Sequence, residues 1–348
     1  MILFLSQYLE TELRRTTIRD VAEKANVSPS TVSLFIRGRA GVSDETGQRI
    51  AAVIEKLKYE PRRRSNHQSE NALVGFLIER FALSAFSDIF YGEVIHGLEA
   101  QAKEAGWGVM FSVIEDDQSP RMVTENQVRG LLILGGSTDG DALAVRLTQQ
   151  GFPVVLVDNY VLGLRVNCVV PDNRWGGYMA FKHLVDSGHE RIAIIEGPRK
   201  YKTLTDRLDG ALRAAEDSGL TLRPEYRQPD LSSGQPKKGY LEMKRLLALP
   251  EPPTAVFAVS DKTAFGALEA VKEAGLRVPT DISLVGFDDV AQTTPPLTTI
   301  HVPKYEMGVL AMQQLLEIIE GRVETPVRTG VYTHLVIRDS TARLEARA

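Results

Sequence analysis

The chain has 348 residues, of which 43% are hydrophobic and 25% are charged, and its formal net charge is −4 at pH 7. This composition is typical of a globular protein of two or three domains, and it excludes collagen-like, disordered and membrane-spanning classes. The single cysteine, Cys168, cannot form an internal disulfide, so we expect a buried thiol in a reducing compartment.

The charge is unevenly distributed along the chain. Residues 14–64 hold 12 basic and 6 acidic side chains, whereas the residues after 64 carry a net charge of −8. Because phosphates attract Lys and Arg, a basic head on an acidic body favours nucleic-acid binding over a merely solvated charged face. Residues 1–16 begin with an apolar run that is shorter than that of a signal peptide and has no basic residues before it. We interpret them as an N-terminal extension.

Three short helices are predicted between residues 17 and 61. Thr17 and Asp20 have the spacing of a capping box, which starts the first helix. Ser28 is suited to cap a second helix one turn after the first ends, and Ser43 to cap a third. Two short helices joined in this way form a helix-turn-helix, and the third would close a small core beneath them. A three-helix domain without DNA contacts is the alternative.

One long run of residues carries a family resemblance. The run TIRDVAEKANVSPSTVSLFIRGRAGVSDETGQRIAAVIEKLKYEP resembles the DNA-binding headpiece of the lactose/galactose repressor (LacI/GalR) family, and matches its D-V-A, V-S-x-x-T-V-S, V-S-x-x-T and Y-x-P signatures in order. In that family the second helix lies in the major groove. The resemblance therefore implies that five residues lie near base edges: Pro29, Ser30, Ser33, Leu34 and Arg37. It implies that five others contact phosphates or belong to the DNA-binding surface: Thr17, Ser28, Thr31, Thr46 and Tyr59.

Two of these positions depart from the family pattern. Leu34 stands where relatives often carry a polar side chain that reads a base, and position 29 is a proline. We expect apolar contact with thymine methyl groups to replace hydrogen bonds at these places.

Residues 62–71 contain few apolar side chains and are predicted to form a hinge. The basic triplet Arg62, Arg63 and Arg64 is expected to contact phosphates. In the resembling family this segment becomes a helix on DNA and inserts a leucine from each subunit into the minor groove; here that place falls on Gln68. Gln is a poorer wedge than Leu, because its amide must be buried between bases, so we expect a mildly bent operator with an A·T-rich centre.

From residue 72 onward, short β-rich runs alternate with helix-length stretches, as in parallel sheets covered by helices. The predicted strands are 74–78, 109–114, 130–134, 154–157, 192–195, 255–259 and 282–285. This part is too long for one doubly wound domain, so two such lobes with a cleft between them are expected. The predicted fold is an all-α helix-turn-helix headpiece followed by an α/β sensor of two doubly wound parallel-sheet lobes.

The second part also resembles the family's sensor, which is similar to a periplasmic sugar-binding protein. The matching stretches include PVVLVDN, SGHERIAIIEGP, TDRLDGALRAAEDSGL and PPLTTIHVP. The resemblance implies that residues 72–348 bind an effector and dimerise. Lobe one would be 72–165 plus 298–329, and lobe two would be 166–297 plus the C-terminal strand.

Ligands of open α/β sheets bind beyond the carboxyl ends of the strands, and charged side chains fall there. Asp261 and Asp288 each follow a predicted strand, and Arg207 lies near the start of a helix that follows another. Carboxylates accept hydrogen bonds from hydroxyl groups and Arg donates a fork, which suits a polyhydroxylated small molecule. The alternative is structural, with Asp261 capping its helix and Arg207 forming an ion pair. The resemblance adds Ser260.

The resemblance also implies that Phe90 and Tyr91 line the effector pocket from lobe one, although packing of a helix face in the core is the alternative. No enzyme signature accompanies these residues. The six histidines lack metal-ligand spacing, and neither a phosphate-binding glycine loop nor an H-E-x-x-H motif is present. We therefore expect no catalysis, no cofactor and no metal.

The sequence favours a cytoplasmic, homodimeric transcription repressor that joins the nucleoid by binding a palindromic double-stranded DNA operator and has no membrane partner. A small effector, a sugar or sugar derivative, would control it as an inducer or a co-repressor. The residues after the last predicted strand, 335–337, are too few for the leucine-heptad helix that makes some relatives tetrameric. A secreted solute-binding protein would need a signal peptide and no basic head. A sugar-acting enzyme would need an acid/base or nucleophile constellation.

Overall fold

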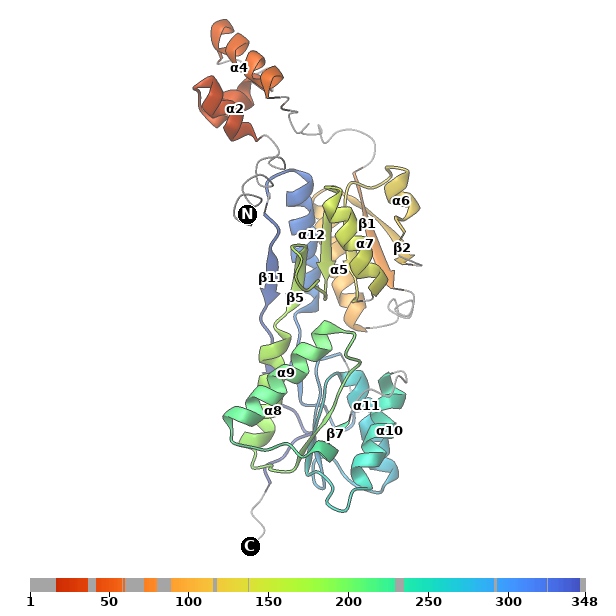
Figure 1. The fold of residues 1–348 in the computed structure, drawn as a ribbon. Coiled ribbons are helices and arrows are strands. Elements are labelled where there is room, and N and C mark those ends of the chain that lie inside the picture. Colours follow the sequence, from red (N-terminus) through yellow and green to blue (C-terminus); the bar gives the residue numbers. More distant parts are fainter. Residues whose placement is uncertain are drawn as a thin grey trace, which may run out of the picture. The chain divides into compact units, whose positions relative to one another are not determined.

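The computed structural model of the chain describes residues 17–36, 42–57, 59, 72–79, 89–114, 118–136, 138–228, 235–290, 293–323 and 325–344. The chain divides into two units, Met1–His67 and Gln68–Ala348, which are described separately (Figure 1). The division falls inside the predicted hinge.

Three helices form the described part of the first unit. They are α2 (Ile18–Ala25), α3 (Pro29–Ile36) and α4 (Asp44–Lys56). Thr17 and Asp20 form the predicted capping box at α2, and the Ser43 side chain accepts a hydrogen bond from the Thr46 N–H at α4. Asn26 ends α2 in a left-handed conformation with φ 52°, which turns the chain toward α3. Residues of all three helices build a small apolar core: Val21, Ala22, Ala25, Val32 and Ile50. The predicted helix-turn-helix is confirmed.

Lobe one of the second unit contains a sheet of six parallel strands in the order β11-β5-β4-β3-β1-β2. These strands are β1 (Leu73–Glu79), β2 (Gly108–Ile114), β3 (Leu131–Leu134), β4 (Val154–Val157), β5 (Asn167–Pro171) and β11 (Arg328–Val331). Helices α5 (Ile89–Glu104) and α12 (Lys304–Ile319) cover one face, and α6 (Arg121–Thr124) and α7 (Thr138–Gln149) cover the other (Figure 1). Because both faces are covered, the central strands are apolar throughout.

Lobe two repeats this arrangement around four parallel strands in the order β7-β6-β8-β9. The strands are β6 (Ile192–Ile195), β7 (Arg227–Gln228), β8 (Ala255–Ala258) and β9 (Ser283–Val285). Helices α8 (Asn173–Asp186) and α9 (Lys202–Asp217) cover one face, and α10 (Gln235–Leu247) and α11 (Asp261–Glu273) cover the other. A short 3-10 helix, η2 (Pro224–Tyr226), precedes β7.

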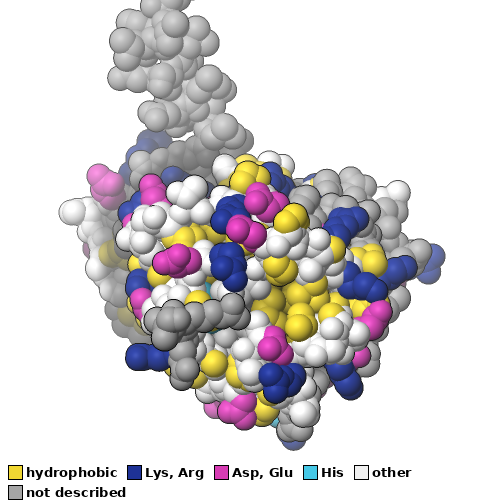
Figure 2. Space-filling model, turned by 90° about the horizontal axis from the view of Figure 1, so that it is seen from below, with side chains coloured by type: hydrophobic (Ala, Val, Ile, Leu, Met, Phe, Trp, Pro, Cys, Tyr) yellow, Lys and Arg dark blue, Asp and Glu magenta, His cyan; other side chains and the backbone are white. Residues whose placement is uncertain are grey.

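The surface in Figure 2 shows Lys and Arg side chains interspersed with Asp and Glu, with hydrophobic side chains gathered in a hollow between them. Mixed charge of this kind does not make the concentrated basic surface that a nucleic acid requires. None of the helices in the described ranges has the length and apolar composition of a membrane span.

The chain passes between the lobes three times, and this corrects the predicted lobe boundaries. Strand β5 pairs with β4 in the first sheet, so lobe one continues to Pro171 instead of ending at residue 165. Strand β11 carries it to Val331, two residues beyond the predicted limit of 329. Between the lobes, β10 (Thr299–His301) pairs antiparallel with β12 (His334–Val336). Strand β5 joins lobe one by pairing with β4, and β11 joins it by pairing with β5, a long-range contact that local sequence does not reveal.

Candidate functional site

A buried arginine is the centre of the polar cluster near the junction of the lobes. Arg207 lies on α9 and is only 3% exposed. Its Nη1 lies 2.8 Å from Asp288 Oδ1 and donates to the Val259 carbonyl at 2.8 Å, and its Nε donates to Asn173 Oδ1 at 2.8 Å. The guanidinium carbon lies 3.8 Å from the centre of the Phe287 ring. The sequence places Arg207 and Asp288 after different strands, and the structure brings the two side chains together.

Two glycines set the position of Arg207. Helices α8 and α9 cross so closely that a Cβ at Gly177 would lie 2.0 Å from the Arg207 carbonyl oxygen. A Cβ at Gly210 would lie 1.9 Å from the carbonyl oxygen of Arg174. No real Cβ tolerates such distances, so the crossing requires glycine at both places.

Asp261 and Ser260 hold the structure around Asp288. Both oxygens of Asp261 are occupied, Oδ1 by the Thr299 hydroxyl at 2.7 Å and Oδ2 by the Val290 N–H at 2.9 Å. Ser260 caps α11, and its Oγ accepts from the Thr263 N–H. Asp261 is therefore the first residue of α11 and not its cap. Both side chains are buried and serve the turn and the helix, which leaves Asp288 as the carboxylate beside Arg207.

Sequence reasoning missed a further carboxyl group, Asp158, which directly follows β4. Its N–H donates to the Val169 carbonyl at 2.9 Å, its φ is 56°, and its Oδ1 is buried without a hydrogen-bond partner among the described residues. Burial raises the pKa of Asp158 to about 7, Arg207 opposes this shift, and Asp288 adds to it. The position that indicates Asp288, a carboxylate just beyond a strand, indicates Asp158 equally well, because Asp158 directly follows β4.

The carboxyl groups around Arg207 hold protons unusually well. Burial raises the pKa of Asp261 to about 7, and the neighbouring Asp288 carboxylate raises it further. Burial likewise raises the pKa of Asp288, while Arg207 lowers it. Asp158 and Asp288 therefore interact with one guanidinium, whose Nε and Nη1 already donate to protein acceptors. Such a cluster offers hydrogen-bond acceptors and protonated donors to an uncharged ligand, and it repels an anion.

We predict that Asp158→Asn changes the pH dependence of stability. The pKa of about 7 in the folded protein lies above the ordinary 3.8, so between these values the folded chain binds more protons than the unfolded chain. The free energy of unfolding then falls as pH rises through this window. Asn is neutral and tolerates positive φ. Calorimetry should show a melting temperature on the order of 5 °C above wild type at pH 8, with the difference shrinking toward pH 4. An equal difference at both pH values would contradict the burial of this charge.

The two aromatic candidates lie on the first turn of α5 in lobe one. Phe90 is 7% exposed and belongs to the apolar core, as the alternative interpretation held. Tyr91 is half-buried, and the two rings meet edge to face with centroids 5.2 Å apart. Tyr91 is thus the more accessible of the two.

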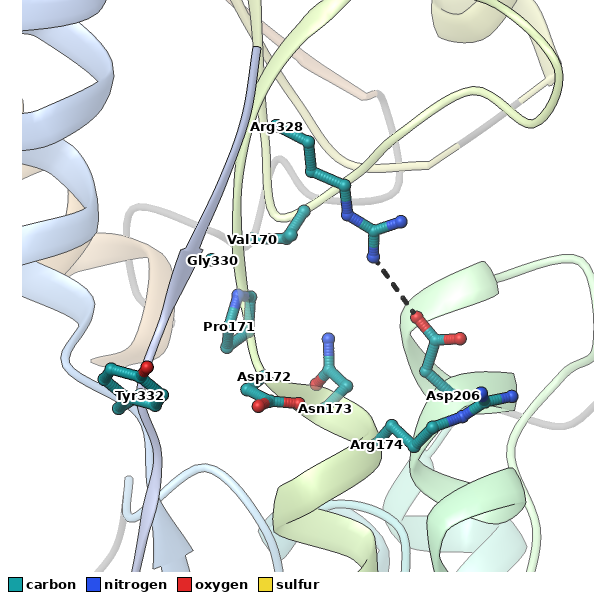
Figure 3. Close-up of a pocket in the computed structure, with 9 residues that line it drawn as sticks. All are labelled: Val170, Pro171, Asp172, Asn173, Arg174, Asp206, Arg328, Gly330 and Tyr332. Carbon is teal, nitrogen blue, oxygen red and sulfur yellow. Dashed lines mark ion pairs between the residues drawn. The ribbon is translucent and has the colours of Figure 1, made fainter.

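A pocket of about 440 Å³ lies where the lobes meet, and none of the predicted site residues lines it. Its lining residues are Val170, Pro171, Asp172, Asn173, Arg174, Asp206, Arg328, Gly330 and Tyr332 (Figure 3). Asn173 belongs both to this lining and to the hydrogen-bond network of Arg207. The pocket therefore adjoins the Arg207 cluster. Within the described ranges, no group of three or more His, Cys, Asp or Glu side chains is arranged to hold a metal ion.

Helix α9 also connects the two lobes across this pocket. In Figure 3 Arg328 of lobe one points toward Asp206 of α9, at 3.8 Å. The Tyr160 hydroxyl donates to Asp206 at 3.0 Å, and the Arg328 guanidinium stacks on the Tyr160 ring at 3.7 Å. One turn earlier, Lys202 pairs with Asp141 of lobe one. Residues that bridge the lobes thus precede Arg207 directly on the same helix.

The first unit presents the predicted DNA-reading residues on the accessible side of α3. Val32 is buried, Pro29 and Ser30 are exposed, and Ser33 and Leu34 are partly exposed. Further predicted residues take part in local contacts there. The Ser28 hydroxyl contacts those of Ser30 at 2.7 Å and Thr31 at 2.8 Å, the Thr17 hydroxyl donates to Asp20, the Thr46 hydroxyl accepts from Ser43, and Tyr59 packs against the core. Five predicted residues lie outside the described ranges: Arg37, Arg62, Arg63, Arg64 and Gln68.

A helix-turn-helix head and a two-lobed α/β sensor with a polar cluster between its lobes define a class, the ligand-responsive DNA-binding regulators. Comparison with known protein families supports this class. Residues 17–62 match the model of bacterial regulatory proteins of the lacI family, and 181–341 match that of the periplasmic binding protein-like domain. The chain belongs to the LacI family of bacterial transcription regulators, and it is not an enzyme.

Similar proteins are found over nearly the whole chain. It is 34% identical to the HTH-type transcriptional repressor PurR of Escherichia coli O139:H28, over 94% of this chain and 97% of that one. The chain is 31% identical to the HTH-type transcriptional repressor PurR of Mannheimia succiniciproducens, over 94% of this chain and 99% of that one. The CelR–cellobiose complex has a TM-score of 0.68 at 29% identity, covering 94% of this chain and 100% of that one. The lac repressor dimer bound to operator and the anti-inducer ONPF has a TM-score of 0.67 at 27% identity, and it also covers 94% of this chain and 100% of that one.

Proposed function

We propose that this regulator is a cytoplasmic homodimeric repressor whose affinity for a palindromic operator is set by an uncharged, hydroxyl-rich effector bound at Arg207, Asp288 and Asp158. One observation carries the effector site: a buried Arg207–Asp288 ion pair lies near Asp158, a carboxyl group with a buried oxygen that has no hydrogen-bond partner among the described residues. A buried polar atom without a partner is unfavourable, and a ligand hydroxyl would satisfy it.

The charge of the site supports a neutral ligand over a phosphorylated one. Asp158 and Asp288 outnumber the single guanidinium of Arg207, whose Nε and Nη1 already donate to protein acceptors. A sugar phosphate would therefore bring a second anion into a site without a free cation among these residues. The CelR complex contains cellobiose, and a LacI-family regulator of Enterococcus faecium with 25% identity and a TM-score of 0.67 contains ribose. Both ligands are neutral and hydroxylated.

A thermal-shift screen with matched ligand pairs tests the proposed effector class. The panel contains ribose and ribose 5-phosphate, glucose and glucose 6-phosphate, cellobiose, and the nucleobases adenine and guanine. A ligand that binds only the folded chain stabilises it by about 2.7 kcal/mol at a hundred times its dissociation constant. We expect a neutral sugar to raise the melting temperature and its phosphate to leave it unchanged. A shift by a phosphate or a nucleobase alone would overturn this choice of effector.

The head supports DNA reading through α3. Pro29 and Leu34 place apolar atoms on its accessible side, which fits contact with thymine methyl groups. The hydroxyls of Ser28, Thr31 and Thr46 lie at helix starts, where phosphates are favoured by helix N–H groups and dipoles. We infer that apolar contacts choose the bases and that hydroxyl and basic groups set the register.

For the hinge we expect Gln68→Leu to bend the operator more and to bind it more tightly than wild type. An apolar wedge unstacks a base step, whereas burying the Gln amide costs about 1–3 kcal/mol without partners. Circular-permutation gel shifts measure the bend angle, and salt titrations measure the affinity. A sharp kink with the wild-type protein, or a leucine variant that neither bends DNA more nor binds tighter, would contradict this role.

A further inference from the structure

A buried lysine stands at an unfavourable place beside the effector site. Lys304 is the first residue of α12 and only 1% exposed. The amino end of a helix carries a partial positive charge that repels a cation, and an ammonium removed from water requires close hydrogen-bond acceptors. A residue in this position needs strong compensation from its surroundings.

Main-chain oxygens supply that compensation. Lys304 Nζ donates to the carbonyl oxygens of Asp288 at 2.9 Å, Val302 at 3.2 Å and Asp289 at 3.3 Å. A half-exposed carboxylate, Glu93 Oε2, lies farther away at 3.6 Å. Two of the three carbonyls belong to the turn that presents the Asp288 carboxylate to Arg207.

That turn has a backbone which L-amino acids rarely adopt. The φ angles of Asp288 and Asp289 are 117° and 55°. Conformations of this kind persist only where surrounding groups hold them. The Asp289 side chain is held by His301 at 2.9 Å and Arg338 at 2.7 Å, but these contacts leave the peptide groups of the turn to be fixed by others.

Lys304 and Asp261 form hydrogen bonds with opposite ends of one of those peptide groups. The carbonyl oxygen of Asp289 faces the Lys304 ammonium, and the N–H of the same peptide, that of Val290, donates to Asp261 Oδ2 at 2.9 Å. A cation at the oxygen and a carboxyl acceptor at the N–H fix the orientation of this peptide dipole, since rotating it would break both interactions. The preceding carbonyl, that of Asp288, also faces Lys304. The direction of the Asp288 side chain therefore depends on the ammonium.

We propose that Lys304 is a positioning residue of the effector site: its ammonium holds the 288–290 turn so that the Asp288 carboxylate faces Arg207. Lys304 belongs to α12 of lobe one, whereas the turn follows β9 of lobe two. The ammonium thus ties the ligand-binding carboxylate to the arrangement of the lobes. The role in effector binding rests on the proposed function, whereas the hold on the turn does not.

Amide hydrogen exchange on the effector-free, full-length protein tests the hold on the turn. Lys304→Met preserves the length of the side chain and removes its donors. We expect exchange at residues 288–290 to become at least tenfold faster, while the strands of both sheets stay unchanged. Lys304→Gln retains two N–H donors and should lie between Met and wild type; it also carries the test if the Met variant does not fold. The control, Lys182→Met, removes an exposed lysine of α8 that pairs with Asp186.

Exchange at 288–290 that matches wild type, or that rises equally throughout lobe two, would overturn the assignment. The effector arm uses calorimetric titration with ribose and cellobiose. We expect at least a tenfold loss of affinity in Lys304→Gln for the sugar that binds wild type. Leu246→Ala, which opens a distant core position of α10, should keep the affinity despite its lower melting temperature. Equal losses of sugar affinity in Lys304→Gln and Leu246→Ala would mean that Lys304 only stabilises the fold and does not position the site. If neither sugar binds wild type, the effector class fails, while the exchange result still decides the role of Lys304.

Discussion

Asp288→Asn is expected to abolish the response to effector while leaving effector-free operator binding close to wild type. The carboxylate pairs with Arg207 at 2.8 Å, and both side chains are buried. Removing one partner of a buried ion pair costs about 3–5 kcal/mol of stability. A lost ligand hydrogen bond to a charged group costs about 1.5–3 kcal/mol, which corresponds to roughly one to two powers of ten in effector affinity. The helix-turn-helix head forms a separate unit, so its contacts with DNA do not include Asp288.

Titration calorimetry measures the effector affinity of this variant, and fluorescence anisotropy measures its operator affinity. Asn is the better substitution, because Ala at a φ of 117° would lack the side chain's hydrogen bonds as well as its charge. Asp186→Asn, an exposed carboxylate on α8, is the matched control and should change neither affinity. Wild-type effector affinity in Asp288→Asn would mean that the effector binds elsewhere.

Gly177→Ala is expected to cause a large loss of stability, although it adds only a single methyl group. The new Cβ would lie 2.0 Å from the carbonyl oxygen of Arg207, so α8 and α9 would have to move apart. Overpacking typically costs about 1–3 kcal/mol, and a displaced backbone places this substitution near the upper end, so the melting temperature should fall on the order of 10 °C. Because α9 carries Arg207, effector affinity should fall as well.

A second glycine provides the control for that substitution. Gly92 lies on α5, and a Cβ there meets no atom within 4 Å. Gly92→Ala should stabilise the chain by roughly 0.5–1 kcal/mol, because alanine loses less backbone entropy in a helix. Thermal melts of the two variants should therefore shift in opposite directions. A Gly177→Ala protein that melts with wild type would show that the helices do not cross as closely as described.

The head was predictable because its signals are local. Thr17 and Asp20 lie three residues apart and form their capping box within one helical turn, and Ser43 caps α4 by itself. The strands that are short apolar runs, such as β3, β4, β6 and β8, were likewise predictable, whereas β5, β7 and β11 were not among the predicted strands. The limits of the lobes were not predictable, because β5 joins lobe one by pairing with β4, and β11 by pairing with β5, 160 residues apart at Cys168 and Arg328.

The effector site was predictable only in part, for a similar reason. Position beyond a strand end selected Asp288 correctly as the partner of Arg207, but the same rule could not show that Asp261 is occupied by Thr299 and Val290. These partners come from other parts of the chain. Lys304 illustrates the limit most clearly: a lysine at the start of a helix reads as a surface residue, and its burial depends entirely on the turn that folds over it.

The most direct test of the account measures operator affinity with and without effector, in wild type and in Asp288→Asn. The operator is a duplex selected by the wild-type protein from a random library, and the effector is the neutral sugar that raises the melting temperature. Coupling between two such sites is typically about 1–3 kcal/mol. We predict that the sugar changes operator affinity at least tenfold in wild type and leaves that of Asp288→Asn unchanged. If the bound sugar leaves the operator affinity of wild type unchanged, or changes it equally in wild type and Asp288→Asn, control of DNA binding through this site is contradicted.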